Sequence, residues 1–175
     1  VADKFADPNL VAADLIAQAE HDVNAQSILI TNNKNLIRLV NISLKKQLKR
    51  LPKKNIASKS LKNFGLAIFS KSKKNILEAI NIIAPEHLEL CTNMNNEIIR
   101  GVKNAGSIFI GKFSPEAIGD YIAGPNHVLP TSGSARFSSG LSVNDFLKRH
   151  SLIKITKTGI ERLGSSVINL AKHEN

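Results

Sequence analysis

The stretch Ser27-Ile28-Leu29-Ile30-Thr31 is a continuous apolar run between two hydroxyl side chains, and Gly65-Leu66-Ala67-Ile68-Phe69 is a second run of the same kind. A continuous run, unlike a polar/apolar alternation, is typical of a strand that is buried on both faces. Between the two runs, residues 36–48 carry apolar side chains at helical spacing, and Leu51-Pro52 breaks that pattern. Buried strands joined by helices indicate a parallel sheet.

The same alternation continues on both sides of this unit. Asp7-Pro8 has the sequence of an N-cap followed by a first helical position, so a helix is expected from there to about residue 20. Downstream, the pattern predicts helices over residues 53–61, 73–83 and 97–103, and strands over residues 87–90 and 107–110. The predicted fold class is α/β: a parallel, incomplete Rossmann-like sheet with helices on both faces.

The last third of the chain has a different character. Residues 111–139 show no clear hydrophobic period and are rich in Gly, Pro and Ser. A loop this long in a compact domain is usually functional. After it, a helix over residues 142–150, a strand over residues 152–155 and a helix from residue 159 to the end are expected. These elements predict an α/β domain that carries the site, residues 1–141, and a C-terminal helical tail, residues 142–175.

The composition is that of a soluble globular domain: 42% of the 175 residues are apolar and 22% are charged. No run of about eighteen apolar residues occurs, so no membrane helix is expected. The first residues lack the apolar core of a secretory signal. The single cysteine, Cys91, excludes a disulfide within the chain and fits a reducing compartment, so a cytoplasmic location is expected.

Positive charge is concentrated in one part of the chain. Of 24 basic residues, many lie between Lys34 and Lys74, where no acidic residue occurs. Such a cluster can neutralise phosphates, so a basic nucleic-acid-binding module is one alternative for the function. The other interpretation is the solvated face of an amphipathic helix. That interpretation is favoured, because the helical pattern over residues 36–48 contains no aromatic side chain to stack on a base.

Two short polar groups are candidates for chemistry. Gln18 and His21 lie three positions apart near the end of the first helix, so they face the same side. An amide oxygen and an imidazole nitrogen can both bind a divalent metal, although such a pair is more often an exposed helix end. Glu86 and His87 follow Pro85 at the start of a strand, and a histidine beside a carboxylate suits proton transfer. The alternative there is a surface glutamate beside a partly buried histidine.

The loop of residues 119–127 is dense in Gly, Asp, Asn and His. Asp120 offers a hard oxygen ligand and His127 a further polar group, although Gly-Pro-Asn is also ordinary turn chemistry. Together, Gln18, His21 and Asp120 would supply three ligands to one metal. Three protein ligands with an open position are typical of a catalytic metal site.

These residues occur in strings that resemble the histidinol dehydrogenase family. The resemblance covers nearly the whole chain in order, and its longest string is highly specific. The strings are Leu-Ile-Ala-Gln-Ala-Glu-His (15–21), Ala-Pro-Glu-His-Leu (84–88), Ala-Gly-Ser-Ile-Phe-Ile-Gly (105–111), Ser-Pro-Glu-Ala-Ile-Gly-Asp-Tyr-Ile-Ala-Gly-Pro-Asn-His-Val-Leu-Pro-Thr (114–131) and Phe-Ser-Ser-Gly-Leu-Ser-Val-Asn-Asp-Phe (137–146).

The resemblance implies an enzyme that oxidises L-histidinol to L-histidine through the aldehyde, with NAD⁺ and a bound Zn²⁺, as a homodimer whose subunits share active sites. It implies zinc ligation by Gln18, His21 and Asp120, and proton transfer by Glu86 and His87. It further implies that the substrate contacts the three zinc-ligand side chains, His87, His127 and, in the neighbouring subunit's site, Glu174 of the tail.

The match also departs from the family. The family's chain is far longer, and its segment for NAD is expected outside this sequence. No Gly-rich dinucleotide fingerprint follows any predicted strand, so no cofactor-binding residues are assigned. The family's fourth zinc ligand, a histidine, has no match here, because His173 precedes Glu174. We therefore expect a C-terminal part of the enzyme that is inactive alone. A related zinc alcohol dehydrogenase acting on another amino or hydroxy compound is the alternative enzyme.

Overall fold

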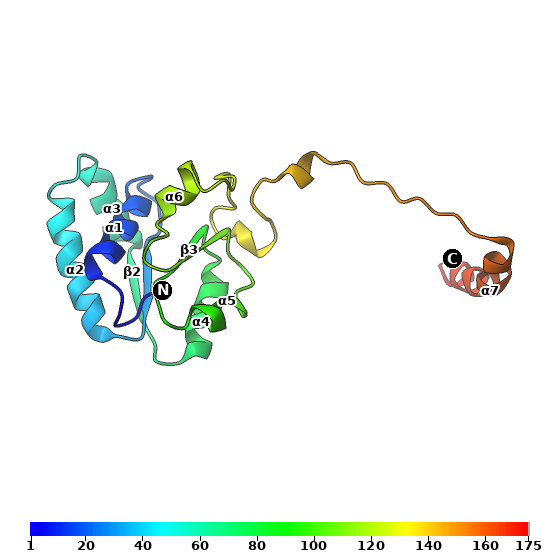
Figure 1. Ribbon diagram of the computed structural model, residues 1–175, viewed down its shortest axis with the longest axis horizontal. Helices are drawn as coiled ribbons and strands as arrows, with labels where there is room; N and C mark the ends of the chain where they lie inside the picture. The colour runs from blue at the N-terminus through cyan, green and yellow to red at the C-terminus, as the bar shows by residue number, and fades with distance from the viewer. Residues whose placement is uncertain (175) are drawn as a thin grey trace. The chain divides into compact units, whose positions relative to one another are not determined.

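The computed structural model describes residues 1–174 and divides into two compact units, Val1–Ser142 and Val143–Asn175. Asn175, the last residue of the predicted tail, lies outside the described residues. The first unit alternates helices and short strands (Figure 1). Its elements are α1 (Pro8–Ala19), β1 (Ile28–Thr31), α2 (Lys34–Leu48), α3 (Lys54–Phe64), β2 (Leu66–Phe69), α4 (Lys73–Ile83), β3 (His87–Leu90), α5 (Asn95–Ile99), β4 (Ser107–Ile110), α6 (Glu116–Tyr121) and η1 (Ser134–Arg136).

All strand pairs in the described part of the chain are parallel, as predicted. β1 pairs with β2, and β3 pairs with β4. Ala2 forms isolated parallel bridges with both Thr31, at the end of β1, and Cys91, just after β3. Residues 1–3 therefore stand between the two strand pairs, and the spatial order is β2, β1, residues 1–3, β3, β4. In chain order this is the 3-2-1-4-5 arrangement of a Rossmann-like sheet, so the predicted fold class is confirmed.

Two apolar cores cover the two faces of this sheet, because Leu29 and Ile30 are neighbours on a strand and point to opposite sides. On one face, Leu29 packs in a buried cluster with α1 and α2. On the other, Ile30 packs in a buried cluster with α4 and α5 (Figure 1). The helices that surround the sheet are therefore held by separate cores, and the predicted cover on both faces is confirmed.

Three local expectations were wrong. Residues 65–69 were expected to be a buried strand, but Leu66 is 53% exposed, because β2 is an edge strand in the described chain. The second unit holds only a short 3₁₀ turn, η2 (Val143–Phe146), where a helix over 142–150 was expected, and no strand over residues 152–155. Those residues are exposed, so neither element gains the buried apolar contacts that stabilise short helices and strands. The final helix, α7 (Lys157–His173), agrees with the expectation.

The basic residues between Lys34 and Lys74 lie on exposed surface, chiefly along α2 and α3. The apolar side of α2, with Leu36 and Val40, is buried in the core against α1. This is the amphipathic arrangement that the spacing predicts. Among residues 1–174, no helix combines the length and apolarity that crossing a membrane requires.

Candidate active site

The segment before β3 is held in a fixed conformation by backbone contacts. Ala84 ends α4 in the left-handed region, with φ of 50°, and turns the chain toward the sheet. The amides of Gly106 and Ser107 then donate to the carbonyl oxygens of Pro85 and Glu86, at 2.9 and 2.8 Å. A β-carbon on Gly106 would lie 2.5 Å from the Glu86 carbonyl oxygen, so only glycine permits this close approach. Glu86 and His87 are thereby placed at the amino end of β3.

Two carboxylates reach this position from α6. Glu116 and Asp120 are four residues apart, so both side chains lie on one face of this short helix. The backbone N–H of Glu116 donates to the Glu89 carboxyl group at 3.2 Å, which attaches the start of α6 to β3. Gly119 lets α6 approach Phe109 of β4, whose ring packs against the ring of His87.

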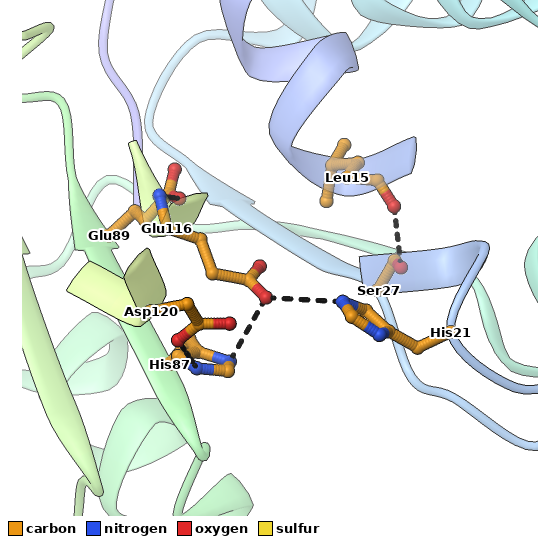
Figure 2. Close-up of polar contacts among 7 residues, drawn as sticks. All are labelled: Leu15, His21, Ser27, His87, Glu89, Glu116 and Asp120. Carbon is orange, nitrogen blue, oxygen red and sulfur yellow. Dashed lines mark hydrogen bonds and ion pairs between the residues drawn. The ribbon is translucent and has the colours of Figure 1, made fainter. Parts of the chain in front are cut away.

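The side chains of His21, His87, Glu116 and Asp120 form a continuous cluster (Figure 2). His87 Nε2 lies 3.7 Å from Asp120 Oδ1, and His87 Nδ1 lies 3.7 Å from Glu116 Oε1. The same Glu116 oxygen is 3.5 Å from Nε2 of His21, which follows α1. Three segments that are remote in the sequence therefore converge at one point.

The donor chemistry of the cluster fits a divalent cation. Ligand atoms of His87, Glu116 and Asp120 all lie within 4.8 Å of one another. Both ring nitrogens of His87 are buried and have no hydrogen-bond partner among the described residues. Buried polar atoms are normally satisfied, so unpaired nitrogens beside two carboxylates indicate a place for a bound group. Imidazole and carboxylate groups are ordinary ligands of Zn²⁺.

Burial alters the protonation of two carboxyl groups here. It raises the pKa of Glu89 to about 8, assisted by a hydrogen bond with the Asp14 carboxyl group. Burial also raises the pKa of Glu116, while the neighbouring His87 and His21 act in the opposite direction. The interior beside His87 is thus poorly solvated, which strengthens every electrostatic contact in it.

A cavity of about 680 Å³ opens beside the cluster. Its size is in the range of small-molecule sites. Gln18 and Glu86 line it, together with His21, His87 and Glu116. The wall therefore carries amide, imidazole and carboxylate groups, the functional groups expected of a site for a polar small molecule.

The residues predicted from the sequence fall into two groups, those in or beside the cluster and those away from it. His21, His87 and Asp120 belong to the contact cluster, and Gln18 and Glu86 line the adjoining cavity. His127 lies in the exposed stretch after α6 and is not part of the cavity lining, while Glu174 is the exposed C-cap of α7 in the second unit. Their roles as zinc ligands, proton carriers and substrate contacts remain predictions.

Sequence reasoning missed Glu116, which lies at the centre of the cluster. The available signal was its spacing: a glutamate four positions before Asp120, just after a proline that can precede a helix. A helix of six residues that contains a glycine shows too short a hydrophobic period to stand out from the loop around it. Glu89 was missed as well, because a carboxylate within a strand carries no local signal of its partners.

The histidinol dehydrogenase family model matches residues 1–175. The chain belongs to the histidinol dehydrogenase family. The histidinol dehydrogenases of Pelagibacter ubique and Caldanaerobacter subterraneus are 52% and 49% identical to it, each over 99% of this chain. The crystal structure of histidinol dehydrogenase from Elizabethkingia anophelis superposes with a TM-score of 0.93, at 40% identity over 99% of this chain.

The match covers only part of each relative. The chain spans 41% and 40% of the two bacterial histidinol dehydrogenases, and 40% of the crystallised one. The predicted family and the expectation of a partial chain are therefore confirmed. The chain holds the cluster on elements of the histidinol dehydrogenase fold.

Proposed function

We propose that this chain forms the zinc and substrate site of a histidinol dehydrogenase that converts L-histidinol to L-histidine through the aldehyde. The observation that carries the proposal is the convergence of His21, His87 and Asp120 beside a cavity that Gln18 and Glu86 line. The family match supports the substrate, since the relatives are named for it.

Gln18, His21 and Asp120 are the residues that would hold Zn²⁺. The bound ion would polarise and orient the amine and imidazole of the substrate. Asp120 contributes a hard oxygen ligand, and His21 and Gln18 contribute a nitrogen and an amide oxygen. Asp120 is common to this set and to the compact group of donors around His87. A fourth protein ligand is expected from outside the described residues.

His87 is the proposed base for the alcohol. Removal of the hydroxyl proton by a ring nitrogen would raise the electron density at the carbinol carbon, and NAD⁺, when bound, would supply the hydride acceptor. The second oxidation adds water to the aldehyde. Glu86, the neighbour of His87 on the cavity wall, would take a proton from that water. Each oxidation would pass one hydride to one NAD⁺. The first would release the alcohol proton, and the second would release two protons, one from the added water and one from the resulting carboxylic acid.

We also propose a homodimer with shared active sites, in the cytoplasm. The exposed apolar side chains of α7 support the dimer: Ile160, Leu163, Val167 and Leu170 are between 44% and 68% exposed. Their spacing forms one stripe along the helix, and such a stripe needs a partner surface. In this assembly Glu174, at the end of α7, would contact the substrate of the neighbouring subunit. Cys91, the single cysteine, fits a reducing compartment.

Zinc binding tests the ligand set. In chelator-competition titrations, the 175-residue chain should bind Zn²⁺, and both His21→Ala and Asp120→Ala should lose binding. His150→Ala is the matched control, because His150 is exposed and lies in the second unit. Zinc affinity that is unchanged in both His21→Ala and Asp120→Ala would contradict the ligand assignment.

Ligand choice tests the substrate. The zinc-loaded chain should bind L-histidinol more tightly than an amino alcohol without an imidazole ring, since two substrate nitrogens then approach the metal instead of one. Equal affinity for the two compounds would favour a related zinc alcohol dehydrogenase acting on another substrate.

A further inference from the structure

Glu116 is a buried carboxylate at the centre of the cluster. Its side chain is 6% exposed, and its Oε1 atom lies 3.7 Å from His87 Nδ1 and 3.5 Å from His21 Nε2. One oxygen thus stands between two imidazole rings that come from opposite ends of the site. One ring is the proposed base, and the other is a proposed zinc ligand.

The position of Glu116 is fixed by β3. Its backbone N–H donates to the carboxyl group of Glu89, two residues after His87 on the same strand. Residues 87 and 89 point to the same face of a strand, so β3 contacts Glu116 through both of them. The carboxylate therefore has little freedom to leave His87, and a rigid neighbour can impose an orientation on that ring.

The two nitrogens of His87 face different carboxylates. Nδ1 faces Glu116, and Nε2 faces Asp120 on the side of the proposed metal and substrate. In a neutral imidazole one nitrogen carries the proton and the other an acceptor lone pair, and the partner of the first decides which is which. Both contacts measure 3.7 Å, but Glu116 is 6% exposed and Asp120 is 21% exposed, so water screens the Glu116 carboxylate less. Glu116 therefore favours the Nδ1–H tautomer and leaves the Nε2 lone pair free to accept the substrate proton.

We propose that Glu116 is a positioning residue, which holds His87 with Nδ1 protonated and Nε2 free and which couples the orientation of His87 to that of His21. The inference deepens the proposed function and rests on it, because a free Nε2 serves the reaction only if His87 is the base. Both contacts of Glu116 are longer than an ordinary hydrogen bond, as catalytic contacts often are in sites without substrate. Carboxylates that orient histidines beside a metal commonly change metal affinity by about 10–100-fold.

The test reads the tautomer directly, in the zinc-free 175-residue chain at mildly alkaline pH. Ring ¹⁵N chemical shifts from long-range ¹H–¹⁵N spectra distinguish the two tautomers. We expect the Nδ1–H form of His87 in the unchanged chain. Glu116→Leu, which fills the space without an acceptor, should give a mixture of both forms. Glu116→Gln keeps an acceptor oxygen and should restore the Nδ1–H form.

Controls separate this effect from misfolding. Glu78→Gln alters an exposed glutamate of α4 and should leave the ring shifts of His87 unchanged. Circular dichroism reports whether each variant folds, and Glu116→Ala replaces Glu116→Leu if the larger side chain perturbs the fold. A pure Nδ1–H tautomer in folded Glu116→Leu or Glu116→Ala would overturn the inference.

Zinc affinity provides the second measurement. Positioning predicts that Glu116→Leu weakens zinc binding by about 10–100-fold without abolishing it. Loss as complete as in Asp120→Ala would make Glu116 a metal ligand and overturn the positioning role. The tautomer result needs neither zinc nor histidinol, so failure of the proposed function and failure of this inference give different outcomes.

Discussion

A β-carbon on Gly119 would lie 2.4 Å from Cε1 of Phe109, so the two residues are as close as a glycine allows. The Phe109 ring in turn lies 5.9 Å, centroid to centroid, from the ring of His87. Gly119 of α6 is thereby connected to the proposed base through one aromatic side chain. The absence of a side chain at position 119 is part of how the site is built.

Gly119→Ala should therefore change the position of the His87 ring. The added methyl group displaces Phe109, and overpacking of this kind costs about 1–3 kcal/mol. The gain in helix propensity, at most about 1 kcal/mol, is smaller. We expect a lower thermal midpoint and shifted ring resonances of His87. Gly164→Ala is the control, because nothing lies within 4 Å of a β-carbon on Gly164. Unshifted His87 resonances in Gly119→Ala would refute the connection.

The stability of the chain should depend on the ionisation of Glu89. Burial, and then the Asp14 carboxyl group, raise the pKa of Glu89 from 4.5 to about 8 in the folded chain. Between these two values the folded state binds more protons than the unfolded state, so the free energy of unfolding falls as the pH rises through this window. One proton gives a slope of at most about 1.4 kcal/mol per pH unit.

Glu89→Gln removes this ionisation and should flatten the slope. Urea unfolding at several pH values between about 5 and 8 measures it, with Glu78→Gln as an exposed control. In Glu89→Gln the side-chain amide oxygen can still accept the backbone N–H of Glu116, so the start of α6 is kept. An identical slope in the unchanged chain and in Glu89→Gln would contradict the assignment.

The 175-residue chain should bind zinc without oxidising histidinol. It spans about 40% of its relatives, and no dinucleotide fingerprint follows any of its strands. With L-histidinol, NAD⁺ and Zn²⁺, we expect no formation of NADH above that of the Asp120→Ala variant. A full-length histidinol dehydrogenase serves as the positive control. Clear turnover by the chain alone would show that it holds a complete active site.

The apolar stripe of α7 should cause self-association. Val167→Asp places a charge in the middle of the stripe and should shift sedimentation toward the monomer. Ser165→Asp is the control, because position 165 lies on the opposite side of the same helix. If both variants sediment like the unchanged chain, the stripe is not the contact between subunits.

Local patterns predicted most of the elements. Continuous apolar runs such as residues 28–31 and helical periods such as residues 73–83 are properties of neighbouring residues, so a sequence displays them directly. The helix over residues 116–121 escaped detection because it is only six residues long and contains a glycine. Over residues 142–155 the apolar side chains indicate regular structure, but these residues are exposed in the folded chain and bury no apolar face, so a short helix or strand is not stabilised there.

The sequence by itself determined the order of helices and strands, the parallel sheet and the family, because these depend on spacing and on strings of residues that need no partner to be recognised. Only the tertiary structure placed residues 1–3 between β1 and β3, exposed β2 at the edge of the sheet, and brought the Glu116 carboxylate between His21 and His87. The physical reason is that strand order and side-chain contact arise from long-range packing, in which each partner is remote along the chain.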